Sequence, residues 1–228
     1  MLIYFITGCC FGSFFCVVAE RLPINQSFLF SRSQCTSCKH PLAYWELVPI
    51  FSIIYKKFRC QHCHQSIPLI CLFSEIAYGS LFVWFYSQPQ TPSTYFLLLW
   101  LTMAFLLSLT DLFYYLVEPR IFYSLSLILW GYGFYLGRPF NSLLFILLLL
   151  LYFSLPTLTN KLGQGDYLLL ISWGVLLPTL SFVYWLFFSS LLGLLAFSIN
   201  YLFFDKKIIE LPFVPFLSLG LCITLWFM

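Results

Sequence analysis

The sequence predicts an all-α polytopic membrane protein with about eight transmembrane helices and a cytoplasmic zinc-binding loop. Apolar residues make up 61% of the 228 residues and charged residues only 8%, a composition typical of multi-span membrane proteins. Apolar segments long enough to cross about 30 Å of hydrocarbon recur along the chain. They lack the alternating pattern of barrel strands, so we expect helices to cross the bilayer. The net charge of +3 is too small to suggest a nucleic-acid partner.

Polar breaks divide the apolar sequence into seven runs, one of which has double length. A single helix over residues 167–204 would extend roughly 57 Å, so we expect this run to turn back once, in the region of Pro178, Thr179 and Ser181. The runs lie at residues 2–19, 67–87, 95–110, 121–136, 143–159, 167–204 and 212–228. The pattern predicts a first transmembrane helix, a polar loop and a transmembrane core, at residues 1–19, 20–66 and 67–228.

Lys and Arg are distributed unevenly between the two sets of connections. If the loop 20–66 is cytoplasmic, the outer side holds only Arg138 and the inner side holds ten basic residues. Cytoplasmic loops retain positive charge, so we expect both termini outside and the large loop inside. The inner residues are Arg21, Arg32, Lys39, Lys56, Lys57, Arg59, Arg120, Lys161, Lys206 and Lys207.

The N-terminus has a second interpretation, because "ITGC" up to Cys9 resembles a lipoprotein cleavage site. A signal peptide would begin with a basic region and would carry a longer apolar stretch before the cleavage site. The chain has neither feature, and its apolar sequence continues well past Cys9. We therefore expect a first span here.

Four of the nine cysteines form two CxxC pairs in the large loop. The pairs "CTSC" and "CQHC" are 21 residues apart, a spacing typical of zinc ribbons; they comprise Cys35, Cys38, Cys60 and Cys63. Disulfides are the competing interpretation, and a reducing cytosol favours zinc. Four thiolates would close the site, so we expect a structural ion. His40, His62 and His64 lie in the same loop and are alternative ligands.

Two aspartates lie at predicted span ends on the inner side. Asp111 ends the third span and Asp166 begins the sixth, and two spans between them return the chain to the same face. Two carboxylates at one semi-buried site cannot both ionise readily, so one keeps its proton. Such a pair suits peptide hydrolysis: the ionised member activates a water molecule, and the protonated member donates to the carbonyl oxygen.

Two glycines precede the second aspartate in "GQGD". Gly163 and Gly165 lack a Cβ, so the backbone can turn sharply there and approach an extended substrate. The alternative is that Asp166 simply caps the helix that follows. The four-residue pattern alone favours the cap, whereas its pairing with Asp111 favours the protease.

Two glutamates are also candidate functional residues. Glu75 lies inside the second span, where an ionised carboxylate costs about 2.5–3.5 kcal/mol, so it is either protonated or paired. A functional and a structural role are equally open for it. Glu118 follows the third span and, like Glu46, lies on the predicted inner side.

These motifs together resemble the type IV prepilin peptidases, bacterial GxGD membrane aspartyl proteases. The resemblance covers nearly the whole chain, and its motifs occur in the family's order. They are "GSFFCVVAERLP", the two CxxC pairs, "SIPLICLFSE", "LTDL", "LGQGD" and "LPFVPFLSLG".

The resemblance implies cleavage of a basic leader from prepilins or pilin-like precursors at the cytoplasmic face of the bacterial plasma membrane. Asp111 and Asp166 would form the catalytic pair, and the basic leader would meet the inner surface near them and near Glu46 and Glu118. Many members also methylate the new N-terminus with S-adenosylmethionine. That activity stays open here, because Cys16, Val214 and Leu168 replace the family's usual Asn, Gly and Lys, and "EPR" stands near its usual "PD".

Two other functions compete with the protease. An ion-coupled transporter would also carry buried carboxylates, but the halves of the sequence show no evident repeat and both aspartates lie at one boundary. A non-catalytic scaffold whose zinc loop binds a partner is the third interpretation. Loss of prepilin cleavage in Asp166→Asn would distinguish the enzyme from both.

Overall fold

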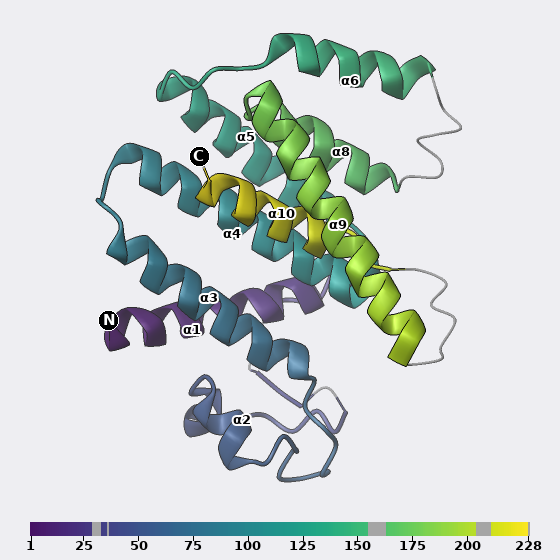
Figure 1. The fold of residues 1–228 in the computed structure, drawn as a ribbon. Coiled ribbons are helices and arrows are strands. Elements are labelled where there is room, and N and C mark those ends of the chain that lie inside the picture. The colour runs from purple at the N-terminus through teal and green to yellow at the C-terminus, as the bar shows by residue number, and fades with distance from the viewer. Residues whose placement is uncertain (29–32, 36, 155–162, 204–210, 228) are drawn as a thin grey trace. The chain divides into compact units, whose positions relative to one another are not determined.

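The computed structural model describes residues 1–28, 33–35, 37–154, 163–203 and 211–227, and helices dominate these ranges (Figure 1). Over the same ranges, strand-like pairing is limited to two isolated bridges, Gln34 with Pro41 and Arg59 with Ser66. The predicted all-α class is confirmed. The chain forms two compact units, Met1–Thr94 and Tyr95–Met228.

The first unit is built on two antiparallel helices, α1 (Leu2–Arg21) and α3 (Leu69–Ser87). A Cβ added at Gly8 would lie 2.8 Å from the Gly79 Cα, and one at Gly12 would lie 3.0 Å from the Glu75 Cα. Glycines four residues apart let two membrane helices approach closely. One turn further along, the Cys16 thiol contacts the Cys71 sulfur at 3.3 Å.

Two short elements fold between these helices, η1 (Tyr44–Leu47) and α2 (Phe51–Tyr55). The Glu46 carboxylate lies 2.6 Å from the Lys56 ammonium and also accepts a 2.6 Å hydrogen bond from the Ala43 N–H. The two elements are thereby fastened to each other. Together with the cysteine pairs they form the predicted polar loop.

The second unit contains α4 (Pro92–Tyr114, whose first residues belong to the first unit), α5 (Pro119–Tyr135), α6 (Ser142–Ser154), α8 (Gln164–Gly174), α9 (Thr179–Phe203) and α10 (Val214–Trp226). Serine hydroxyls join its helices in pairs: Ser108 donates to Ser218 at 2.7 Å, and Ser126 and Ser172 are 3.1 Å apart. The Trp185 indole donates to the Leu217 carbonyl at 2.8 Å. Such polar contacts hold helices together where apolar burial gives no advantage over lipid.

The double-length run is divided as predicted. Helix α8 ends at Gly174, a turn follows, and α9 begins at Thr179 directly after Pro178. A Cβ at Gly174 would lie 2.6 Å from the Phe182 ring, so the two helices are in close contact beside the turn.

Four helices of the described chain are long and apolar enough to cross a bilayer: α1, α3, α4 and α9. Helices α6, α8 and α10 have 13, 11 and 13 residues, and α5 has 17. At 1.5 Å per residue, each is shorter than a hydrocarbon layer of about 30 Å. The count of eight spans therefore stays a prediction.

Candidate functional site

Asp111 lies in the last turn of α4, which continues to Tyr114 rather than ending at the charge. Its side chain is buried, and one carboxylate oxygen accepts a 2.9 Å hydrogen bond from the Val214 N–H. Val214 is the first residue of α10, where backbone N–H groups have no partner within the helix. The carboxylate therefore binds the positive end of that helix.

Asp166 is the third residue of α8, and Gly163 is the N-cap of that helix. The interpretation of Asp166 as the N-cap residue is therefore wrong. A Cβ at Gly163 would lie 3.2 Å from an Asp166 carboxylate oxygen, so the carboxylate folds back over this glycine. A bare backbone at position 163 gives the carboxylate room in this position.

Gly165 allows a second close approach. A Cβ there would lie 2.6 Å from Cγ2 and 2.8 Å from Cβ of Val117, in the connection between α4 and α5. Any larger residue would push the start of α8 away from this connection. The contact joins Gly165, the residue before Asp166, to Val117, which lies three residues after the end of the helix that carries Asp111.

The two aspartates lie at the same end of the second unit. The other end of α8 lies next to the α5–α6 connection, because the carbonyl of Val175, which follows α8, accepts a 3.0 Å hydrogen bond from the Asn141 N–H. At the aspartate end, the negative charge of Asp111 acts on the Asp166 carboxyl. Two partly buried carboxylates within such reach disfavour the doubly ionised state.

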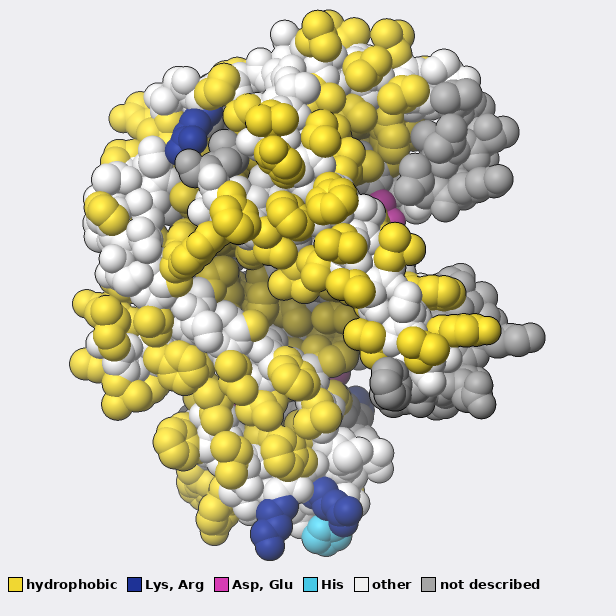
Figure 2. Space-filling view, viewed as in Figure 1, with side chains coloured by type: hydrophobic (Ala, Val, Ile, Leu, Met, Phe, Trp, Pro, Cys, Tyr) yellow, Lys and Arg dark blue, Asp and Glu magenta, His cyan; other side chains and the backbone are white. Residues whose placement is uncertain are grey.

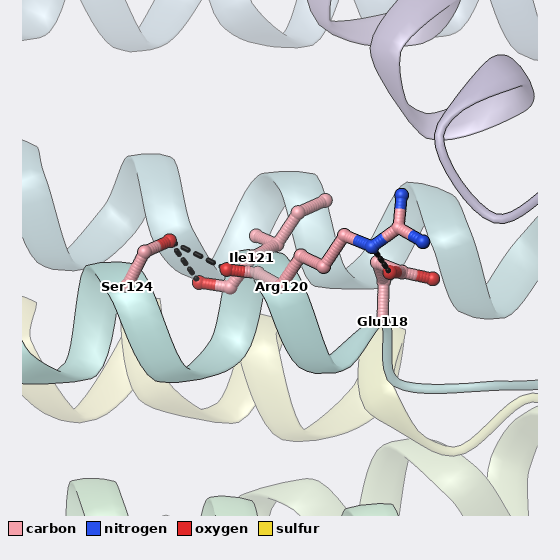
Figure 3. Close-up of polar contacts among 4 residues, drawn as sticks. All are labelled: Glu118, Arg120, Ile121 and Ser124. Atoms are coloured by element: carbon pink, nitrogen blue, oxygen red, sulfur yellow. Dashed lines mark hydrogen bonds and ion pairs between the residues drawn. The ribbon is translucent and has the colours of Figure 1, made fainter. Parts of the chain in front are cut away.

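Glu118 begins α5 as its N-cap residue and is buried (Figure 3). Its carboxylate lies 3.7 Å from Nε of Arg120, whose side chain is 59% exposed. Ser124 bonds back to the Arg120 carbonyl at 2.6 Å. Glu118 is thus an ion-paired carboxylate next to Val117, and Arg120 is its cation on the solvent side.

Glu75 belongs to the first unit and is 4% exposed. Its carboxylate accepts a 2.7 Å hydrogen bond from the Ile50 N–H and another from the Ser13 hydroxyl. The first contact ties the polar loop to α3. In the structure Glu75 therefore supports the loop, and both partners lie in its own unit.

The four predicted metal ligands form one cluster. The sulfurs of Cys35, Cys38, Cys60 and Cys63 lie within 4.8 Å of one another. The Cys35 and Cys63 sulfurs are 3.8 Å apart, and a tetrahedral site with sulfurs about 2.3 Å from its ion needs about this separation. The donor set fits a metal ion, and the candidate cluster found among the described residues contains no histidine.

The two cysteine pairs repeat one backbone pattern. The Lys39 N–H donates to the Cys35 carbonyl and the His64 N–H to the Cys60 carbonyl, each at 3.0 Å, and both donors have positive φ. Backbone N–H groups of Cys38 and Ser37 lower the pKa of the Cys35 thiol to about 6. Backbone N–H groups of Cys63 and His62 likewise lower the pKa of the Cys60 thiol, so the first cysteine of each pair favours the thiolate, the form that binds metals.

Residues 6–88 match the family model described as the bacterial peptidase A24 N-terminal domain. Curated relatives named prepilin leader peptidase/N-methyltransferase are 38% identical over 78 residues in Myxococcus xanthus and 28% identical over 124 residues in Bacillus subtilis. The resemblance to the type IV prepilin peptidases is confirmed. The matches cover 34% and 52% of this chain and 23% and 48% of those relatives.

The Aeromonas salmonicida relative of the same name is 28% identical over 265 aligned positions, which cover 94% of this chain and 87% of the relative. No solved structure matches the chain. These similarities to prepilin peptidases do not favour the transporter interpretation.

Three contacts of the site were not predicted: the Val214 N–H on Asp111, Val117 against Gly165, and Arg120 beside Glu118. Only the last had a local signal, because the two charges are two residues apart. The other two join segments that are distant in the sequence.

Proposed function

We propose that this chain is a membrane-embedded aspartyl endopeptidase that removes the basic leader from type IV prepilins or pilin-like precursors. The carrying observation is the pair Asp111 and Asp166, partly buried at one end of the second unit and within electrostatic reach of each other. The similarity to prepilin leader peptidases supports the choice of substrate. The cytoplasmic face of a bacterial plasma membrane, crossed several times by the chain, is the proposed location.

Both aspartates take part in the proposed reaction. The ionised member removes a proton from water, and the oxygen of that water attacks the scissile carbonyl carbon. The protonated member donates a hydrogen bond to the carbonyl oxygen as negative charge develops on it. A proton then passes to the leaving amine as the carbon–nitrogen bond breaks, so no covalent enzyme intermediate forms.

Glu118 is proposed to help recognise the leader. Its partner Arg120 is largely exposed, and the pair is close to Val117 and Gly165 beside the aspartates. A basic leader side chain can take the place of the Arg120 guanidinium at this buried carboxylate. Glu46 is a weaker candidate than the sequence suggested, because Lys56 neutralises it at 2.6 Å.

Zinc is the proposed ion of the four cysteines. Zinc bound by four thiolates is a closed structural site, and it would supply folding free energy to a loop that has little apolar core. The N-methyltransferase activity, with S-adenosylmethionine as methyl donor, rests only on the names of the relatives. The described residues define no donor set that we assign to this cofactor.

Mass spectrometry of a co-expressed prepilin tests the proposal. We expect a new N-terminus directly before the hydrophobic segment of the prepilin, and the same spectrum reports any added methyl group. An intact leader in cells that contain normal amounts of this chain would contradict the proposal.

A further inference from the structure

The loop between α1 and α3 carries a dense apolar surface. Over residues 45–55, which we call the interfacial segment, Trp45 is 73% exposed, Phe51 72% and Tyr55 80%, and Leu47, Val48 and Ile54 are exposed as well. Figure 2 shows hydrophobic side chains over α2, with basic side chains at the same end of the loop. Exposed apolar patches of this kind mark an interaction site.

The interfacial segment is attached to α3 at a point well inside the end of that helix. The Ile50 N–H bonds to Glu75 at 2.7 Å, and Glu75 lies six residues after the start of α3, or about 9 Å along the helix axis. At this level α3 packs on Gly12, inside the apolar helix α1. The start of α2 is therefore held beside the spans rather than out in the aqueous part of the loop.

Internal contacts leave the apolar side chains facing outward. Glu46 is occupied by Lys56 and by the Ala43 N–H, and Ile53 is the buried residue of α2. The one charged side chain of the segment is thus paired within the loop, which lowers the cost of bringing it next to lipid. Its exposed aromatic rings include tryptophan and tyrosine, the residues enriched at membrane interfaces.

We propose that the interfacial segment inserts into the headgroup region of an anionic phospholipid bilayer and anchors the metal-binding loop to the membrane surface. Lys57 and Arg59 follow it directly and are exposed, so they complement lipid phosphates. Apolar rings inserted beside basic side chains are the pattern of interfacial anchors. The choice of the cytoplasmic leaflet follows the proposed topology, whereas the insertion itself does not depend on proteolysis.

The test uses the full chain in vesicles of phosphatidylcholine and phosphatidylglycerol with brominated acyl chains. The fluorescence of Trp45 is obtained by subtracting the emission spectrum of Trp45→Phe from that of the wild-type protein. We expect this emission to be blue-shifted, to lose most of its intensity to the brominated lipid, and to resist iodide in the water. Quenching by iodide without quenching by bromine would overturn the proposal.

Two further experiments determine whether lipid or substrate covers the interfacial segment. The double variant Lys57→Gln, Arg59→Gln should lose the additional blue shift that phosphatidylglycerol gives over phosphatidylcholine alone, and an unchanged response would exclude the anionic preference. If protection from iodide appeared only after a prepilin peptide was added, the occupant would be the substrate and the lipid proposal would fail. Unchanged metal content in each variant confirms an intact loop.

Discussion

The Asp111 carboxylate accepts a hydrogen bond from the Val214 N–H at 2.9 Å, which joins the last turn of α4 to the first residue of α10. The residue therefore has a structural contact as well as its proposed catalytic role. An asparagine oxygen can still accept this hydrogen bond, whereas alanine cannot. Asp111→Asn is accordingly the substitution that separates chemistry from packing.

Gly165→Ala should lower cleavage activity because its Cβ would overlap Val117 and displace the start of α8, at a cost of about 1–3 kcal/mol. Adding Val117→Ala removes the closer atom and should restore part of the activity. The matched control is Gly131→Ala in α5, where an added Cβ meets nothing within 4 Å. Cleavage rates that are equal in Gly165→Ala and the wild type would contradict the packing argument.

Glu118→Gln should slow the processing of strongly basic leaders more than that of weakly basic ones, because it removes the negative charge that faces Arg120. The measurement is the cleavage rate of paired prepilins that differ only in leader charge. If both rates fell by the same factor, Glu118 would not take part in recognising the charge of the leader.

Cys35→Ser should remove the bound metal, because three thiolates cannot complete the tetrahedral set. Elemental analysis of purified protein measures this directly, with zinc expected in the wild type. Cys10→Ser changes an exposed thiol of α1 outside the cluster and should keep the full metal content. Equal metal content in the two variants would rule out the cluster as the site.

The Glu46–Lys56 pair predicts a dependence on pH. The hydrogen bond from Lys56 lowers the pKa of Glu46 below its ordinary value of 4.5. The unfolded chain therefore takes up this proton first on acidification, so the contribution of the pair is present above pH 4.5 and is lost as the pH falls through the lowered pKa. We expect the pair to contribute no more than about 1 kcal/mol to the free energy of unfolding.

This contribution is measured by comparing the thermal unfolding midpoints of the wild type and Glu46→Gln. Protonation of the cysteines affects both proteins equally, so it cancels in the difference between the two midpoints. The difference should shrink as the solution is acidified. A difference that stayed constant, or grew, would show that the pair is not coupled to folding.

The sequence predicted the features that depend on local patterns. Apolar runs located the helices, Pro178 located the break between α8 and α9, and the CxxC spacing located the cluster. The end of α4 was placed too early, because "DLFY" continues the helix past a charge that α10 stabilises.

The tertiary contacts were outside the reach of these patterns. No local signal shows that Gly165 meets Val117, or that Glu75 holds the Ile50 N–H, because each contact depends on how distant segments pack. Four predicted basic residues of the inner connections, Arg32, Lys161, Lys206 and Lys207, lie outside the described residues.

Cleavage of a co-expressed prepilin by Asp111→Asn and Asp166→Asn, each at wild-type protein level, tests the central claim most directly. Gly131→Ala, where an added Cβ meets nothing within 4 Å, serves as a control that should still cleave. We predict that both aspartate variants leave the leader intact, because neither can share a proton with its partner carboxylate. A mature N-terminus produced by either variant would contradict the account.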